Sequence, residues 1–162
     1  MDKDMFLSLY KTFIRPMLEY SPQVWNPHLA RNIIALEKVQ RRATKMVPQL
    51  RNMPYDQRLV ALKLYPLEER RVRGDMIATY KMVNGLLDID SSKLIPFNVT
   101  NVGTHSHNYQ LMGMKCNTMW RKKFFSQRIV PSWNALNKAI VESDCIDTFK
   151  ERYDREMLGR YR

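Results

Sequence analysis

Two groups of basic side chains are the residues of this 162-residue chain whose types and spacing best suit binding chemistry. The first group lies between positions 38 and 45, where spacings of three and four bring its members to one face of a predicted helix: Lys38, Arg41, Arg42 and Lys45. Such a face can neutralise the backbone phosphates of a nucleic acid without reading its sequence. The structural alternative is a solvated helix face, within which Glu37 offers some self-pairing.

The second group interleaves aromatic and basic residues between positions 120 and 128. Its candidate nucleic-acid-binding members are Trp120, Arg121, Lys123, Phe124 and Arg128. Rings of this kind stack on unpaired bases while the neighbouring cations hold phosphates, which is how many single-strand-binding surfaces work. The two rings could equally pack against a neighbouring helix.

A search for a reaction centre finds none of the usual motifs. The sequence has no Gly-rich phosphate loop, no H-E-x-x-H, no G-x-S-x-G, no C-x-x-C and no two adjacent aspartates. Asp88 and Asp90 come nearest to a paired carboxylate site for metal-assisted phosphoryl transfer, and their setting is typical of a solvated turn. His105, His107 and Cys116 match no compact zinc spacing, and Cys145 has no partner in sequence. We therefore predict no catalytic residue and no metal site.

Apolar periodicity predicts an all-α fold of about six amphipathic helices in one or two small bundles. The expected helices cover 6–20 with a kink at Pro16, 30–47 up to Pro48, 52–63, 66–84, 125–140 and 144–158. Residues 86–114 show no sustained period. The predicted organisation is therefore a helical region at 1–85, a polar linker at 86–114 and a C-terminal helical extension at 115–162.

The charge is concentrated in two blocks. The chain carries 27 Lys and Arg against 16 Asp and Glu, for a formal charge of +11. Residues 31–85 hold 12 basic and 5 acidic side chains, and residues 115–138 hold 6 basic and no acidic ones. This pattern favours a polyanion-binding surface, with nucleic acid ahead of an acidic membrane.

Neither a membrane span nor a secretory signal is expected. The longest stretch without a charge, 94–114, is interrupted by proline, glycine, asparagine and histidine. The start of the chain lacks the features of a signal peptide, and two cysteines do not indicate a disulfide framework. We therefore expect a soluble intracellular protein without membrane partners.

An ordered series of longer motifs carries a family resemblance. The segments are IRPMLEY at 14–20, VWNPH at 24–28, LEKVQRRATK at 36–45, LEERRVRGD at 67–75, FFSQRIV at 124–130 and Trp133-Asn134. In this order they resemble the region after the catalytic palm in reverse transcriptases of non-LTR retrotransposons, the jockey-like LINE elements. The resemblance covers about residues 6–152 and is strongest over 36–45.

The resemblance implies a role in holding nucleic acid. Residues 1–85 would correspond to part of the helical thumb and residues 115–162 to the C-terminal extension, which cradle an RNA or DNA template-primer. The endonuclease, fingers and palm of the parent RNA-directed DNA polymerase, with the Mg²⁺ of that palm, have no counterpart here. The resemblance therefore implies no cofactor and no activity for this chain alone, and a nuclear location for a functional protein.

The sequence is also compatible with two other functions. One is a domesticated, non-catalytic nucleic-acid-binding protein. The other is a helical protein-protein adaptor that uses exposed methionine and aromatic side chains. The 11 methionines of the chain make this possible, because methionine is common at adaptable binding surfaces.

Overall fold

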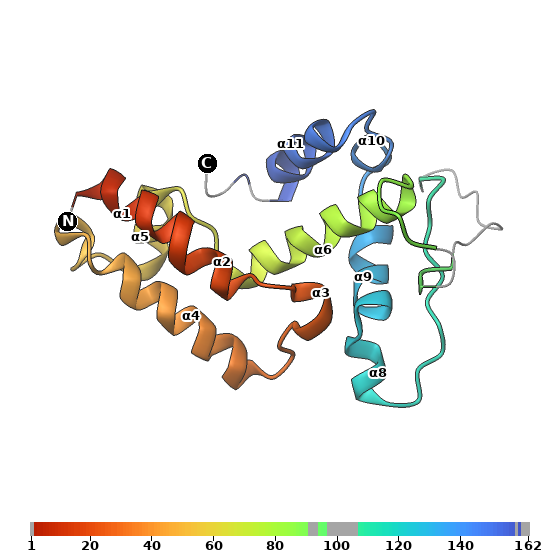
Figure 1. Cartoon of the computed structure of the whole chain (residues 1–162), viewed down its shortest axis with the longest axis horizontal. Helices are drawn as coiled ribbons and strands as arrows, with labels where there is room; N and C mark the ends of the chain where they lie inside the picture. The colour runs from red at the N-terminus through yellow and green to blue at the C-terminus, as the bar shows by residue number, and fades with distance from the viewer. Residues whose placement is uncertain (1, 91–93, 97–106, 158, 160–162) are drawn as a thin grey trace. The chain divides into compact units, whose positions relative to one another are not determined.

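The computed structural model describes residues 2–90, 94–96, 107–157 and 159, and the chain divides into two compact units (Figure 1). The first unit comprises residues 1–72 with 158–162, and the second comprises residues 73–157. The predicted all-α fold is confirmed, because the elements of the described residues are helices. Each unit encloses its own cluster of buried hydrophobic side chains.

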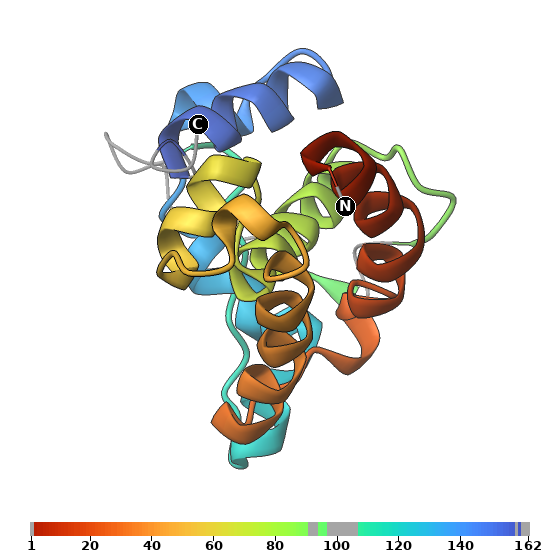
Figure 2. The same cartoon turned by 90° about the vertical axis from the view of Figure 1, so that its left-hand side faces the viewer.

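The first unit is built from short helices around one long one. In chain order they are α1 (Lys3–Leu9), the π-helix η1 (Tyr10–Ile14), α2 (Arg15–Leu18), α3 (Pro22–Trp25), α4 (Ala30–Thr44), the 3₁₀-helix η2 (Pro48–Leu50), α5 (Tyr55–Leu62) and the start of α6 (Leu67–Val83). The segment from α1 to α2 runs alongside α4 (Figures 1 and 2). The buried cluster consists of Phe6, Tyr10, Ala43, Val47, Leu59, Leu62 and Leu64.

The π-helix changes which side chains of the first segment are buried. The N–H of Arg15 donates to the carbonyl of Tyr10, five residues back, just before Pro16. Proline lacks an N–H and its ring clashes with the carbonyl four residues earlier, so a wider turn next to it removes the conflict. As a result, the single apolar stripe expected from the sequence divides. Phe6, Tyr10 and Leu18 are buried, whereas Leu9, Phe13, Met17 and Tyr20 are exposed.

Helix boundaries follow proline and glycine closely. Helix α5 begins after Pro54, which stands at its N-cap, and it ends at Lys63 in the left-handed region with φ of 50°. Helix α6 ends as predicted at Asn84 and Gly85, where Gly85 has φ of +64°. The N–H of Leu86 donates to the carbonyl of Lys81 over 2.8 Å, which completes a Schellman-type cap.

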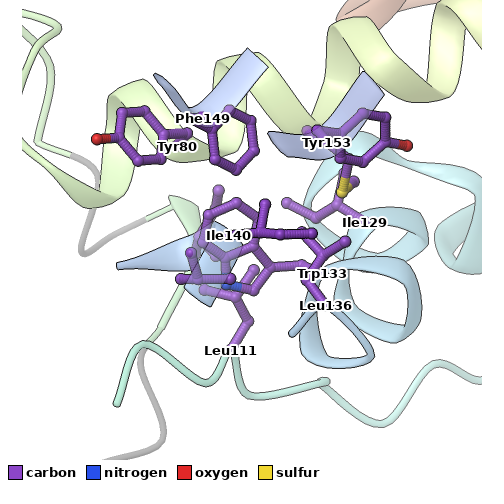
Figure 3. Packing of buried hydrophobic residues seen from close by; sticks show 11 residues of the cluster. Tyr80, Leu111, Ile129, Trp133, Leu136, Ile140, Phe149 and Tyr153 are labelled. Atoms are coloured by element: carbon purple, nitrogen blue, oxygen red, sulfur yellow. The ribbon is translucent and has the colours of Figure 1, made fainter. Parts of the chain in front are cut away.

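The second unit packs around a tryptophan. Its helices are the remainder of α6, α8 (Met119–Lys123), α9 (Phe125–Asn134), α10 (Lys138–Val141) and α11 (Ile146–Met157). The rings of Tyr80 and Phe149 stack with centroids 4.4 Å apart. Figure 3 shows Trp133 beneath them. Trp133 is fully buried and its indole N–H donates to the carbonyl of Tyr109 over 2.8 Å. Apolar residues recur here every three or four positions, which predicts a core stripe of Phe125, Ile129, Trp133, Leu136 and Ile140; the last four are buried, and Phe125 is partly buried against them.

The described part of the interval 86–114 belongs to the second unit. Ile95 and Leu111 are buried in its core, and the Asn134 side chain bonds both the N–H and the carbonyl of Leu111 at 2.9 Å. Along the chain, the boundary between the two units falls between Val72 and Arg73, inside α6, rather than in this interval. The organisation expected from the sequence, with domains at 1–85 and 115–162 joined by a linker, stays a prediction.

Within the part of the chain that the structure describes, no helix has both the length and the apolar character needed to span a lipid bilayer.

Candidate nucleic-acid interface

Helix α4 presents the first group of cations on one exposed side. Lys38, Arg41 and Arg42 lie on the helix, Lys45 follows as its C-cap, and all four are exposed. The opposite side of the helix is buried through Gln40, Ala43 and Thr44. The structure therefore brings the four predicted residues together on the solvent side of a helix whose other side is fixed.

A polar network that helical periodicity does not reveal fixes that buried side. The Tyr10 hydroxyl donates to Oε1 of Gln40, and Nε2 of Gln40 donates to the Tyr55 hydroxyl over 2.9 Å. The Tyr55 hydroxyl in turn donates to Oε1 of Glu37, whose Oε2 accepts the N–H of Leu67 at 3.0 Å. The only signal for this network in the sequence is Gln40 itself, a polar residue on the side of the helix that also carries Ala43 and Val47.

Burial and Glu37 keep the two tyrosines protonated. The pKa of Tyr10 is raised by burial first and then by the negative charges of Glu19 and Glu37. The pKa of Tyr55 is raised by burial first and then by its hydrogen bond to Glu37. Both hydroxyls are therefore donors at neutral pH, and Glu37 is engaged by this network rather than only by the cations beside it.

The half of the basic face around Lys38 and Arg41 has mixed charge. These two residues line an open pocket of about 500 Å³. The other residues that line it are Ile33, Ile34, Glu37, Tyr55, Asp56, Pro66 and Glu68. The guanidinium of Arg41 lies 4.5 Å from the centre of the Tyr55 ring, a cation-π contact that orients it. A phosphate here would meet acidic as well as basic groups.

The half around Arg42 and Lys45 is different. These two residues line a second open pocket of about 550 Å³ together with Met46, Pro48 and Arg51. Arg51 is not among the residues predicted from the sequence. Its distance from Arg42 along the chain matches no helical period, and only the turn at Pro48 brings it close, so a periodicity argument could not have found it.

The second group of candidates lies around a helix break. Helix α8 is capped by the Thr118 hydroxyl, which accepts the N–H of Arg121 at 3.3 Å, and it ends at Phe124, which is extended and also caps α9. The side chains of Trp120 and Phe124 are 66% and 55% exposed, so neither belongs to a buried core. Arg121 and Lys123 are exposed as well, and the guanidinium of Arg121 lies 5.6 Å from the centre of the Phe124 ring.

Arg128 lies on α9, and its guanidinium is engaged in contacts within the protein. Its Nε and Nη2 donate to the two carboxylate oxygens of Asp75 over 2.9 and 3.0 Å, and Nη1 donates to the carbonyl of Lys123. The side chains of Arg128 and Asp75 are 15% and 4% exposed. A contact between Arg128 and a phosphate stays a prediction. The structure shows that Arg128 joins α9 to α6 through Asp75.

The side chains considered for a zinc site have other surroundings. His107 is buried with Nε2 3.1 Å from the Trp133 carbonyl, Cys116 donates to the carbonyl of Met114, and His105 lies outside the described residues. Among the described residues, no three His, Cys, Asp or Glu side chains gather in a way that could hold a metal ion.

Comparison with known proteins finds no relative. No family model, no curated protein and no solved structure matches the chain.

Proposed function

We propose that this chain grips nucleic acid for a reaction centre located elsewhere, as the thumb and C-terminal extension of a non-LTR retrotransposon reverse transcriptase would. The ligand is an RNA or DNA template-primer, and the chemistry belongs to a palm and fingers, with their Mg²⁺, that this chain does not contain. The observation that supports the proposal is the exposed face of Lys38, Arg41, Arg42 and Lys45 on a helix whose other side is buried.

The dimensions of this face suit a phosphate backbone. At a rise of about 1.5 Å per residue, the four positions extend over roughly 10 Å of helix. A DNA duplex carries about one charge per 1.7 Å of its axis, so several phosphates fall within that length. Contacts of this kind fix position without specifying sequence, which is what a polymerase thumb needs.

Charge reversal on the face tests the proposal. In the variant K38E/R42E/K45E, Arg41 is retained because it contacts Tyr55. The matched control K3E/K11E/K138E makes the same change in net charge at exposed lysines elsewhere. Affinity for a labelled primer-template duplex is measured by fluorescence anisotropy over a range of salt concentrations. We expect the face variant to lower the slope of log affinity against log salt by about 0.9 for each phosphate that is no longer neutralised.

The control should retain most of the slope, and both variants should keep the wild-type helical circular dichroism. A wild-type chain that does not bind the duplex at low salt, or a control whose slope falls as much as that of the face variant, would reject the proposal. The wild-type chain should extend no primer, since its proposed role is binding only.

A protein-protein adaptor is the second candidate, and one observation favours it. Exposed apolar side chains recur every three or four residues along the α1 to α2 segment: Met5, Leu9, Phe13, Met17 and Tyr20. A contiguous apolar stripe of this type is typical of a protein contact. Under this alternative, F13E/M17E would abolish capture of a partner protein, and K38E/R42E/K45E would leave capture unchanged. In a domesticated nucleic-acid-binding protein, K38E/R42E/K45E would abolish nucleic-acid binding and F13E/M17E would leave it unchanged.

A further inference from the structure

Among the described residues that line the pocket at the end of α4, every charged one is basic. Of the described residues that line it, Arg42, Lys45 and Arg51 are charged, and Met46 and Pro48 are apolar. We propose that this pocket seats one phosphate of a bound nucleic-acid strand together with the nucleoside attached to it. The inference rests on the proposed function and adds to it a specific nucleotide subsite and a residue, Arg51, outside the basic face.

The chain path explains how Arg51 reaches this position. After α4 the N–H of Met46 donates to the carbonyl of Ala43 over 2.9 Å, and Val47 is buried with the core of the first unit. Pro48 then starts η2, and the N–H of Arg51 donates to the Pro48 carbonyl over 3.3 Å. A buried anchor followed by one tight turn therefore holds Arg51 beside the end of α4.

The three cations are available to a ligand. None of their side chains forms a hydrogen bond or ion pair with another described residue, and all three are exposed. The end of α4 contributes about half a negative charge through the helix dipole, which three full positive charges outweigh. The neighbouring pocket around Lys38 and Arg41 also contains carboxylates, so an anion is favoured at the Arg42 side.

The apolar part of the lining favours a nucleotide over a bare anion. Met46 is 58% exposed and Pro48 is exposed, so both present apolar surface to the pocket. A methionine sulfur makes favourable contacts with aromatic rings, and the rings of nucleobases are of this kind. A volume of about 550 Å³ falls within the range of small-molecule sites, and a single phosphate would leave most of it empty.

Two measurements on the full chain test the subsite. The first compares R51Q with the matched charge-removal control K11Q in binding to a labelled single-stranded oligonucleotide. Removal of one phosphate contact with a single strand should reduce the salt slope by about 0.7 and the affinity on the order of fivefold at 0.1 M salt. The variant R51K, which keeps a point charge, should recover part of the affinity, and K11Q should bind as the wild type does.

The second measurement follows the Met46 methyl signal by NMR, with M46L used to assign it. Adenosine monophosphate should shift this signal in the wild type and not in R51Q. Adenosine without phosphate and inorganic phosphate should each shift it less. An equal shift with inorganic phosphate would overturn the nucleoside part of the inference, and a shift caused only by a polyglutamate peptide would overturn the subsite as a whole.

Failure of the subsite differs from failure of the proposed function. Oligonucleotide binding with a steep salt dependence, an unmoved Met46 signal and wild-type behaviour of R51Q would overturn the subsite and leave the proposed function standing. Absence of oligonucleotide binding together with a Met46 shift by adenosine monophosphate would reject the proposed function and support the pocket as a nucleotide site.

Discussion

His107 and Cys145 are both ionisable residues that the sequence leaves without a partner, and the structure gives them opposite surroundings. His107 is buried in the second unit, edge-on to the Trp133 ring at a centroid distance of 5.8 Å. Cys145 is exposed just before α11. Burial disfavours the charged form of a side chain, whereas hydrogen bonds donated to a thiolate favour it, so the two pKa values are lowered for different reasons.

The stability of the second unit should depend on pH through His107. Burial lowers the pKa of His107, against the opposing influence of the Trp133 carbonyl and of Glu142. The neutral form is therefore favoured in the folded state, so its contribution to stability is complete above the unfolded pKa of about 6.5 and is lost as pH falls below it. The free energy of unfolding, measured with urea between pH 7.5 and 5, should fall less in H107Q than in the wild type.

The exposed His28 supplies the control for this experiment. H28Q makes the same substitution at an exposed position outside the buried cluster around Trp133. Parallel pH profiles for H107Q and the wild type would contradict the assignment to His107.

Cys145 should be the faster of the two cysteines to react with iodoacetamide at pH 7. Its pKa is lowered by hydrogen bonds from the Thr148 hydroxyl first, and then from the backbone N–H groups of Thr148 and Asp147. A larger thiolate fraction on an exposed side chain raises the rate of alkylation. Mass spectrometry of the modified peptides should show Cys145 labelled before Cys116, and T148V should slow Cys145 alone. Equal rates in T148V and the wild type would contradict this account.

At the scale of elements, helices with a regular apolar period were predictable from the sequence. The left-handed residue Gly85 after α6 and the core stripe through Trp133 follow from local signals, because the residue types at these positions favour that backbone geometry and that burial. The helix expected over 30–47 is confirmed, but it ends at Thr44, before Pro48, which begins η2. The basic face of α4 follows from the same periodicity, and the four cations predicted there do lie together.

Features that depend on partners distant in sequence were not predictable. Gln40 is buried because Tyr10 and Tyr55 meet it, which no spacing reveals. Arg70 and Arg73 form ion pairs with Glu19 and Asp154, which lie 51 and 81 positions away in the sequence. In both examples the tertiary fold determines which partner the side chain contacts, and the local sequence does not indicate that partner.

Arg128 should affect folding more than nucleic-acid binding. Its bidentate pair with Asp75 joins α9 to α6, and removing one partner of a buried pair costs about 3 kcal/mol. R128M should therefore lower the free energy of unfolding by roughly this amount. The variant D75N/R128M, which removes both charges, should be more stable than R128M because it leaves no buried carboxylate that has lost its Arg128 partner.

Binding of R128M to a primer-template duplex, measured well below its unfolding temperature, should keep the wild-type salt slope. A lowered slope with unchanged stability would instead place Arg128 in contact with phosphate and support the prediction made from the sequence.

At the scale of the whole molecule, two surfaces of different character occur in one chain with a formal charge of +11. The basic face of α4 belongs to the first unit and lacks exposed aromatic rings of its own, apart from the contact between Arg41 and Tyr55. The α8 segment belongs to the second unit and combines exposed rings with cations. Duplex phosphates suit the basic face of α4, and stacking of unpaired bases suits the α8 segment, in addition to the nucleotide proposed for the pocket at the end of α4.

A primer-template with an unpaired overhang should therefore bind more tightly than a blunt duplex or a single strand of the same length. It offers one chain both kinds of contact, phosphates of a duplex and unpaired bases. Removing the rings in W120A/F124A should reduce the advantage of the overhang, since each stacked base contributes about 1–3 kcal/mol. The same variant should leave affinity for the blunt duplex unchanged, whereas K38E/R42E/K45E should weaken binding to every substrate. Equal affinity of the wild type for blunt and overhanging duplexes would show that Trp120 and Phe124 do not stack on bases, and would leave α4 as the one surface on which the proposed grip depends.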